Sequence, residues 1–165
     1  MGPLWMFWCV PGMFVAAPSP EIVELGRGTW VLKGIPSEET MLKVRHLRIT
    51  CVIDLRKEED AGFDGPRESQ ALANMDCGYA RVVVGRVPAR SDFEDFRLIR
   101  NSLPPGARVL VHCTNGNRAA AMACAWAVLD ARVPREKALG LARQAGLVHP
   151  ETEAALLAYL KEAKG

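Results

Sequence analysis

A cysteine and an arginine stand close together in this sequence, directly after a run of apolar residues. The segment VLVHCTNGNRAAAMACAW covers residues 109–126 and places Cys113 and Arg118 on either side of Thr-Asn-Gly-Asn. In a loop that joins a strand to a helix, backbone N–H groups converge on one point, and the helix N-terminus and a guanidinium both favour negative charge there. Such surroundings lower the pKa of a thiol, so Cys113 is predicted to be a thiolate nucleophile beside an anion site.

The other residues of this loop suit the binding of an oxyanion. Gly116 can adopt a positive φ and lets the backbone approach a ligand closely. Arg118 offers a planar fork that can bind two oxygens of a phosphate or of a sulfur oxyanion. We therefore predict two catalytic residues, Cys113 and Arg118, and an oxyanion-binding loop that comprises Thr114, Asn115, Gly116, Asn117 and Arg118.

Purely structural interpretations exist for the same residues. Cysteine is among the residues most often buried in a core, and His112 suits a hydrogen-bonded histidine at a strand end. Thr-Asn-Gly-Asn is also ordinary turn composition. The chemical interpretation is favoured by the order of the parts: a strand, a cysteine, a loop with glycine, an arginine and then a helix. For Cys51 and Cys124, burial is a simpler explanation than a disulfide bond with Cys113.

The elements around this loop predict a three-layer α/β/α fold with a central, mostly parallel sheet. The first two predicted strands are EIVELG and TWVLKG, which form a hairpin or a pair of short extended segments. The others are ITCVIDL, Tyr79–Val84 and Arg108–Cys113. The first predicted helix begins at Ser37, and the second extends from Pro66 to Cys77 with Gly78 as its stop. The third starts from a capping box of Ser91 and Glu94. Three more helices are predicted over Arg118–Ala131, Pro134–Gly146 and about Glu151–Lys161. Strands that alternate with helices favour parallel pairing, and ligands then bind at the carboxyl ends of the strands, where Cys113 stands.

Length and composition limit the possible functions. The chain of 165 residues is long enough for one domain, which we place at residues 21–165. The formal net charge is +2 and the basic residues are spread along the chain, so we expect no nucleic acid as a partner and no stable membrane insertion. The five cysteines have no spacing typical of a metal site, and we expect neither a metal nor another cofactor.

Residues 1–20 form an apolar N-terminal segment, MGPLWMFWCVPGMFVAAPSP. Its length fits the core of a signal peptide, but no basic residue precedes it, Pro11-Gly12 interrupts it, and Pro18 follows the small residues of a cleavage site. A tail packed on the domain is the alternative. We expect a cytoplasmic protein, or an exported, periplasmic one if this segment is a signal.

The segment HCTNGNRA resembles the active-site loop of cysteine-dependent phosphatases. The resemblance is closer to a bacterial branch of tyrosine and dual-specificity phosphatase-like proteins, the beta-lactamase-hydrolase-like or DUF442 group, and it extends over Ile22–Val148 through WVLKGIPSEETM, CVIDLRKEED and YARVVV. It implies a phosphatase-like fold in which Cys113 forms a phosphocysteine while Arg118 and the loop amides bind the phosphoryl oxygens. The implied substrate is a phosphorylated protein or a small anionic phosphomonoester.

Two features of the loop depart from the phosphatase pattern. Four residues separate Cys113 from Arg118, where those phosphatases have five, and this spacing is familiar from rhodanese-like sulfurtransferases, whose tighter loop suits a persulfide sulfur. Ala119 follows the arginine where phosphatases carry a Ser or Thr, whose hydroxyl helps the thiolate leave. Breakdown of a phosphoenzyme is therefore expected to be slow.

The general acid of the phosphatases is missing from its expected position. After the strand that precedes the acid loop, the chain continues with GRV, residues 85–87, instead of an Asp. Asp92 is a weak candidate, because it suits the first turn of a helix better. Arg86 and Arg90 either extend a basic rim or are simply solvated, and Asp54 is predicted to be a structural acceptor for neighbouring backbone or arginine groups.

The sequence therefore predicts a cysteine-dependent phosphatase that hydrolyses phosphomonoesters, from phosphotyrosine proteins to small aryl phosphates, through a phosphocysteine. The loop spacing and the missing acid leave two alternatives. One is a sulfurtransferase that carries a persulfide on Cys113, although AGFDGPRESQAL lacks the His-Ile-x-Gly-Ala segment usual in rhodanese-like sequences. The other is a weakened pseudophosphatase that binds an oxyanion without turning it over.

Overall fold

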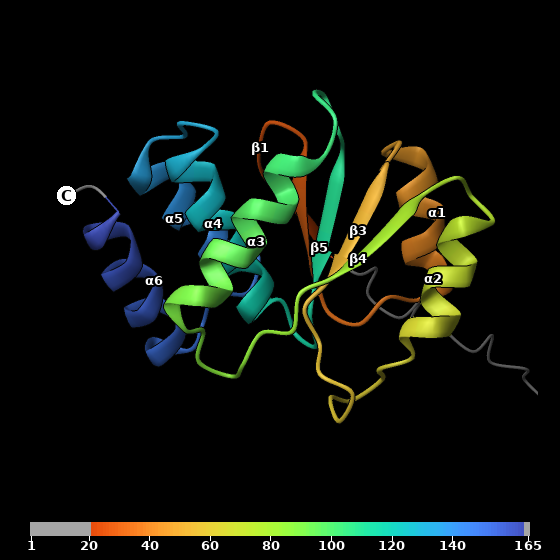
Figure 1. The fold of residues 1–165 in the computed structure, drawn as a ribbon, viewed down its shortest axis with the longest axis horizontal. Helices are drawn as coiled ribbons and strands as arrows, with labels where there is room; N and C mark the ends of the chain where they lie inside the picture. Colours follow the sequence, from red (N-terminus) through yellow and green to blue (C-terminus); the bar gives the residue numbers. More distant parts are fainter. Residues whose placement is uncertain (1–20, 164–165) are drawn as a thin grey trace, which may run out of the picture.

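The computed structural model describes residues 21–163, which form a five-stranded sheet with helices on both faces (Figure 1). The strands are β1 (Glu21–Gly26), β2 (Thr29–Lys33), β3 (Cys51–Asp54), β4 (Gly78–Arg81) and β5 (Val109–His112). Their order across the sheet is β1-β2-β5-β3-β4. β1 and β2 form the predicted antiparallel hairpin, and the other three pairings are parallel. The predicted mostly parallel sheet is confirmed.

The helices form one layer on each face of the sheet, which confirms the three-layer architecture (Figure 1). On one face, Val44 and Leu72 belong to an apolar cluster with Trp30 and Leu32 of β2. A larger apolar cluster fills the other face. The first face carries α1 (Glu38–His46) and α2 (Gly65–Ala73), and the second carries α3 (Arg90–Ser102), α4 (Asn117–Leu129), α5 (Arg135–Gln144) and α6 (Pro150–Glu162).

Local signals in the sequence explain where several helices begin and end. Ser37 caps α1 in a reciprocal capping box with Thr40, because each accepts a hydrogen bond from the backbone of the other. Asp64 caps α2 by accepting from the backbone N–H of Arg67 at 3.2 Å. α5 ends just before Gly146, whose φ of 115° is in the region that favours glycine.

The alanine-rich helix α4 is the central helix of its layer. Every residue from Asn117 to Ala127 is buried, and α4 contacts α3, α5, α6 and the sheet. Alanine leaves room for neighbouring helices on all sides, so α4 is a core helix rather than a surface helix. The N-terminus of α4 is thereby fixed directly below the predicted loop.

The register of the parallel strands brings several positions together at one edge of the sheet. His112 at the end of β5 lies beside Asp54 of β3 and Leu32 of β2, and Asp54 lies beside Arg81 of β4. β3 and β5 are buried along their whole length, as their continuous apolar runs predict. Cys113 follows β5 at this edge, which is the carboxyl edge of the parallel strands, as predicted.

The predicted boundaries of α2 and β4 are wrong. α2 ends at Ala73 rather than at Cys77, because the chain turns at Asp76 with a φ of 54°. Gly78 does not stop the helix but begins β4, beside the first residue of β3. β4 also ends earlier than the predicted strand Tyr79–Val84, although the backbone N–H groups of Val82 and Val84 still donate to the carbonyl oxygens of Asp54 and Leu55.

The predicted cap of α3 is also wrong. The helix begins at Arg90, and the side chain of Asp92 accepts a hydrogen bond from the backbone N–H of Ala89 at 2.8 Å. Ser91 and Glu94 therefore lie inside the helix, where Glu94 pairs with Arg90 instead. The carboxylate of Asp92 lies in the first turn, where the helix dipole favours it.

None of the helices within residues 21–163 is long and apolar enough to cross a membrane. The apolar segment predicted at residues 1–20 lies outside the described residues, as does Cys9. The four described cysteines are buried and free, namely Cys51, Cys77, Cys113 and Cys124.

The substitution Ala123→Leu is expected to destabilise the protein, because Ala123 is fully buried in α4 and the larger side chain overpacks the core. The expected loss is about 1–3 kcal/mol of unfolding free energy, measured by urea denaturation. Ala158→Leu makes the same change at an exposed position of α6 and should alter stability by less than about 0.5 kcal/mol. Equal effects of the two substitutions would contradict the described packing of α4.

Candidate active site

The loop between β5 and α4 is shaped by two glycines. Gly116 is the N-cap of α4 and has a φ of 89°, and a Cβ there would lie 2.5 Å from the carbonyl oxygen of Ala145. Gly146 faces the loop from the other side, where a Cβ would lie 2.9 Å from the carbonyl oxygen of Asn115. A side chain at either position would collide with backbone. The loop therefore packs backbone against backbone on the connection between α5 and α6.

Cys113 lies at the base of this loop, with its sulfur facing the loop backbone. The Sγ atom accepts a hydrogen bond from the backbone N–H of Gly116 at 3.2 Å and lies 3.9 Å from Oδ1 of Asn115. Among the described residues, this is the one loop amide that donates to the sulfur, whereas the sequence predicted a ring of several. The side chain of Cys113 has no exposed surface, so the loop covers the predicted nucleophile in this conformation.

Arg118, in the first turn of α4, is held by three acceptors. Its Nη1 donates to Oδ2 of Asp60 at 2.7 Å and to the carbonyl oxygen of Val84 at 3.0 Å, and its Nη2 donates to Oγ1 of Thr114 at 3.1 Å. The loop after β3, the segment after β4 and the loop after β5 thus meet at one guanidinium. A bound phosphate would have to share this guanidinium with Asp60 or replace the Asp60 carboxylate on it.

Asn117 fixes the loop to the start of α6. Its Oδ1 accepts from the backbone N–H groups of Val148 and His149, both at 3.1 Å, and its Nδ2 donates to Oγ1 of Thr152 at 2.8 Å. The backbone N–H of Asn117 donates to Oδ1 of Asn115 at 3.1 Å. Asn117 is predicted to bind the oxyanion, and in this structure its side chain and its amide are engaged within the protein, where they hold the loop.

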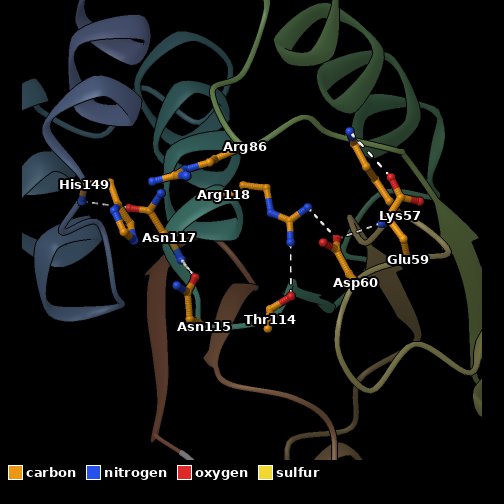
Figure 2. Close-up of a pocket in the computed structure, with 9 residues that line it drawn as sticks. All are labelled: Lys57, Glu59, Asp60, Arg86, Thr114, Asn115, Asn117, Arg118 and His149. Atoms are coloured by element: carbon orange, nitrogen blue, oxygen red, sulfur yellow. Dashed lines mark hydrogen bonds and ion pairs between the residues drawn. The ribbon is translucent and has the colours of Figure 1, made fainter.

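A pocket of about 390 Å³ opens beside the loop (Figure 2). The predicted residues Thr114, Asn115, Asn117 and Arg118 form part of its wall. Its other lining residues are three basic groups, Lys57, Arg86 and His149, and two carboxylates, Glu59 and Asp60. With Arg118, the basic groups outnumber the acidic ones, which favours an anion.

A buried charged cluster lies at the carboxyl edge of the sheet. Oδ1 of Asp54 accepts from Nε of Arg56 at 2.9 Å and Oδ2 accepts from its Nη2 at 2.8 Å, while the hydroxyl of Tyr79 donates to the same Oδ2 at 2.9 Å. Nη2 of Arg56 also donates to Oε2 of Glu68 at 2.5 Å, and Oε1 of Glu68 lies 2.7 Å from Nε2 of His112. The prediction that Asp54 is a structural acceptor is confirmed.

The chemistry of this cluster follows from its burial. Burial raises the pKa of Asp54, but the hydrogen bonds and charge of Arg56, together with His112, outweigh burial and hold that pKa below its ordinary value. Ligand atoms of Asp54, Glu68 and His112 lie within 4.8 Å of one another, as in a metal site. Because Arg56 already bonds both carboxylates, a cation would have to displace the guanidinium, and the donor set does not fit a metal ion. Nδ1 of His112 has no hydrogen-bond partner among the described residues.

The remaining predicted side chains divide between the pocket and the surface. Arg86 lines the pocket and is 86% exposed, so it forms part of a basic rim. Arg90 pairs with Glu94 and Glu162 and is not among the described lining residues. Asp92, the weak candidate for the general acid, caps α3 and does not line the pocket either.

The other buried cysteines are core residues. Burial raises the pKa of Cys124 to about 12 and that of Cys77 to about 11, and it also raises the pKa of Cys51. Thiols with a raised pKa remain protonated and poorly nucleophilic at neutral pH. This agrees with the interpretation of Cys51 and Cys124 as buried structural residues.

Four residues of the pocket were not predicted from the sequence, namely Lys57, Glu59, Asp60 and His149. Asp60 belongs to the loop that follows β3, and the carboxyl end of β3 adjoins that of β5. Strand adjacency indicates that this loop lies near the pocket, but it does not indicate which acidic residue of KEED points toward Arg118. His149 lies between α5 and α6, where the path of the chain depends on contacts with Gly116 and Asn117 rather than on a local pattern.

Solved structures of cysteine-dependent phosphatase-like proteins share this fold. A DUF442 protein from Shewanella putrefaciens CN-32, named as a candidate phosphatase, is 19% identical with a TM-score of 0.72, and the match covers 88% of this chain and 95% of that one. PTPMT1 in complex with PI(5)P is 18% identical with a TM-score of 0.66, and the match covers 87% and 96%. The core catalytic domain of the PP-IP phosphatase SIW14 from S. cerevisiae, in complex with citrate, is 14% identical with a TM-score of 0.65, and the match covers 87% and 88%.

These comparisons define the fold. The chain has the α/β fold of the cysteine-dependent phosphatase-like proteins, and the resemblance stated from the sequence leads to the same group, DUF442 proteins included. No family model matches the sequence, and no curated protein sequence matches it.

The substitution Asp54→Ala is expected to destabilise the fold by about 3–5 kcal/mol, because it leaves the buried Arg56 without its bidentate partner. Urea denaturation at pH 7 measures the loss. Glu21→Ala removes one partner of an exposed ion pair and should cost less than about 1 kcal/mol.

The effect of Asp54→Ala should also depend on pH. Since the folded-state pKa of Asp54 is lowered, its stabilising contribution is fully present above the unfolded pKa of about 3.9 and is lost as the pH falls through the folded value. The stability difference between wild type and variant should therefore shrink below about pH 4. A difference that stays constant down to acid unfolding would contradict this account of the cluster.

Proposed function

We propose that this protein is a cysteine-dependent phosphatase that hydrolyses phosphomonoesters through a phosphocysteine on Cys113. The observation that carries the proposal is the sulfur of Cys113 beneath a glycine-bearing loop, in a hydrogen bond with the Gly116 amide, beside a pocket that contains Arg118. The loop supplies a nucleophile, and the guanidinium supplies a charge for the phosphoryl oxygens. The phosphatase-like fold supports this chemistry.

An anionic phosphate ester is the substrate class that suits the pocket. Lys57, Arg86 and Arg118 surround a space open to solvent, which accommodates a phosphorylated side chain or a small phosphomonoester. The similar structures include PTPMT1 with PI(5)P and a PP-IP phosphatase with citrate, and both bound molecules are anionic. These neighbours support the class of substrate, not a particular compound.

The covered sulfur sets a requirement for this mechanism. Attack on phosphorus needs a direct path from Sγ of Cys113, and that atom has no exposed surface. Substrate binding must therefore uncover this atom, which lies 3.2 Å from the Gly116 amide nitrogen and 3.9 Å from Oδ1 of Asn115. It must also bring a phosphoryl oxygen to Arg118, where Asp60 is bound in this structure.

A sulfurtransferase is the second candidate, and the short loop favours it. Only four residues separate Cys113 from Arg118, and one loop amide donates to the sulfur among the described residues. A single sulfane sulfur needs fewer donors than a phosphoryl group. In this candidate function, Cys113 would carry a persulfide rather than a phosphate.

Rapid quenching during the hydrolysis of 4-nitrophenyl phosphate is expected to trap one phosphoryl group on Cys113, because breakdown of the intermediate is slow. Intact-mass analysis followed by peptide mapping measures it. Cys113→Ser should remain unmodified, and Cys124→Ser, at a buried cysteine outside the loop, should still be phosphorylated.

The same measurement distinguishes the alternatives. A gain of one sulfur on Cys113 after incubation with thiosulfate, with no phosphoryl adduct, would identify the sulfurtransferase. Binding of inorganic phosphate without either adduct and without turnover would identify the non-catalytic oxyanion-binding protein. Either result would overturn the phosphatase proposal.

Ala119→Ser is expected to raise kcat by about tenfold, because the phosphatases that this loop resembles carry at this position a hydroxyl that donates a hydrogen bond to the departing thiolate. The value of kcat/KM should change little, since it reports steps up to the formation of the phosphocysteine. Pre-steady-state kinetics measures both, and the initial burst of nitrophenol should shrink. Ala120→Ser makes the same change at the next buried position of α4 and should leave kcat unaltered. A kcat that rises equally in both variants would contradict the role given to residue 119.

A further inference from the structure

Cleavage of a phosphomonoester with a poor leaving group needs a proton donor, and this chain has no acidic residue at the position where phosphatases carry that donor. The segment after β4 carries GRV at residues 85–87, and Asp92 is committed to the cap of α3. Among the described residues that line the pocket, the carboxylic acids are Glu59 and Asp60. Both belong to the loop between β3 and α2, which the phosphatase pattern did not indicate.

Asp60 is better placed than Glu59 to reach a bound phosphate. Its Oδ2 lies 2.7 Å from Nη1 of Arg118, so the carboxyl group is one guanidinium away from the phosphoryl oxygens that Arg118 would bind. The side chain of Asp60 is 23% exposed, which leaves it accessible from the pocket but not freely solvated. Glu59 is 75% exposed and pairs loosely with Lys57 at 3.9 Å. Figure 2 shows Asp60 directed toward Arg118 and Glu59 on the outer side of the same loop.

The position of Asp60 is fixed by the protein and not by Arg118 alone. Oδ2 of Asp60 also accepts from the backbone N–H of Lys57 at 2.8 Å. Arg56, which anchors the buried cluster, donates from Nη1 to the carbonyl oxygen of Gly62 at 2.6 Å. The loop that carries Asp60 is therefore tied at its start and after its turn. Within residues 21–163, the hydrogen bonds from Lys57 and Arg118 both fall on Oδ2, so Oδ1 is the oxygen available to a ligand.

We propose that Asp60 is the general acid of the phosphatase reaction, an inference that rests on the function proposed above. As the thiolate of Cys113 forms a bond to phosphorus and the bond from phosphorus to the leaving oxygen breaks, the protonated carboxyl of Asp60 transfers its proton to that oxygen. The leaving group departs as a neutral alcohol or phenol, and Asp60 becomes a carboxylate. The carboxylate then takes a proton from the water that attacks the phosphocysteine, which releases inorganic phosphate, regenerates the thiolate and restores the acid.

Substrate binding supplies the protonated form of Asp60. In the empty site, burial raises the pKa of Asp60, but the bonds from Lys57 and Arg118 outweigh burial and hold it below its ordinary value. A dianionic phosphoryl group neutralises Arg118 and places negative charge beside the carboxyl, and both effects raise its pKa. The other charged or titratable groups that face this space are Lys57, Glu59, Arg86 and His149.

The test compares Asp60→Asn with wild type on two substrates, phenyl phosphate and 2,4-dinitrophenyl phosphate. An asparagine retains an oxygen that can accept from Lys57 and Arg118, but it cannot donate the acid proton. The expected result is a loss of about 10²- to 10⁴-fold in kcat/KM for phenyl phosphate, with nearly unchanged kcat/KM for the dinitrophenyl ester, whose leaving group needs no proton. Asp60→Glu should restore part of the activity on phenyl phosphate. Asp92→Asn is the matched control and should affect neither substrate.

Several outcomes would overturn the assignment. An equal loss on both esters, with weaker competitive inhibition by inorganic phosphate, would make Asp60 a residue that merely positions Arg118. A selective loss in Asp92→Asn would move the acid to that residue. If Asp60→Asn does not fold, the folded Asp60→Glu variant is measured instead, and an equal loss of kcat/KM on both esters in that variant would also refute the assignment. If wild type hydrolyses neither ester, the proposed function itself fails, which is a separate result.

Discussion

The site depends on the close approach of two backbone segments, the loop after β5 and the connection between α5 and α6. The approach is possible because residues 116 and 146 have no side chains, since a Cβ at either would lie within 3 Å of a carbonyl oxygen. The same contact turns the amide of Gly116 toward the sulfur of Cys113 and lets Asn117 bond the chain before α6. The geometry of the loop is therefore set by tertiary contact, and α6 is as much a part of the site as β5.

Two unlike supports hold this loop in place. Below it, the buried alanine-rich α4 fixes the start of the helix through apolar packing. Beside it, the cluster of Asp54, Arg56, Glu68 and His112 fixes the carboxyl ends of β3 and β5. Burying charges costs several kcal/mol per ion, and their mutual attraction roughly repays that cost, so the cluster adds more to geometry than to net stability. Arg56 also donates a hydrogen bond to the carbonyl oxygen of Gly62, which ties the loop that carries Asp60 to this cluster.

Much of the fold was predictable from the sequence because its signals are local. Continuous apolar runs indicated β3 and β5, a serine marked the start of α1, and the order of strand, cysteine, glycine and arginine indicated the loop. The prediction failed at two helix ends, because Asp76 turns the chain after α2 and Asp92 caps α3 in place of Ser91. The partners of Arg118 were also hidden, because Val84 and Asp60 reach it from segments far apart in the sequence.

The complete burial of the Cys113 side chain has a consequence for the chemistry of its sulfur in a cell. Peroxide and alkylating reagents act on thiolates that they can reach, so accessibility limits damage as much as ionisation does. A sulfur covered by its own loop is shielded from oxidation to irreversible acids while the pocket is empty. Binding of a phosphate would uncover the sulfur, but at that moment the bound ligand itself blocks the access of other molecules to it.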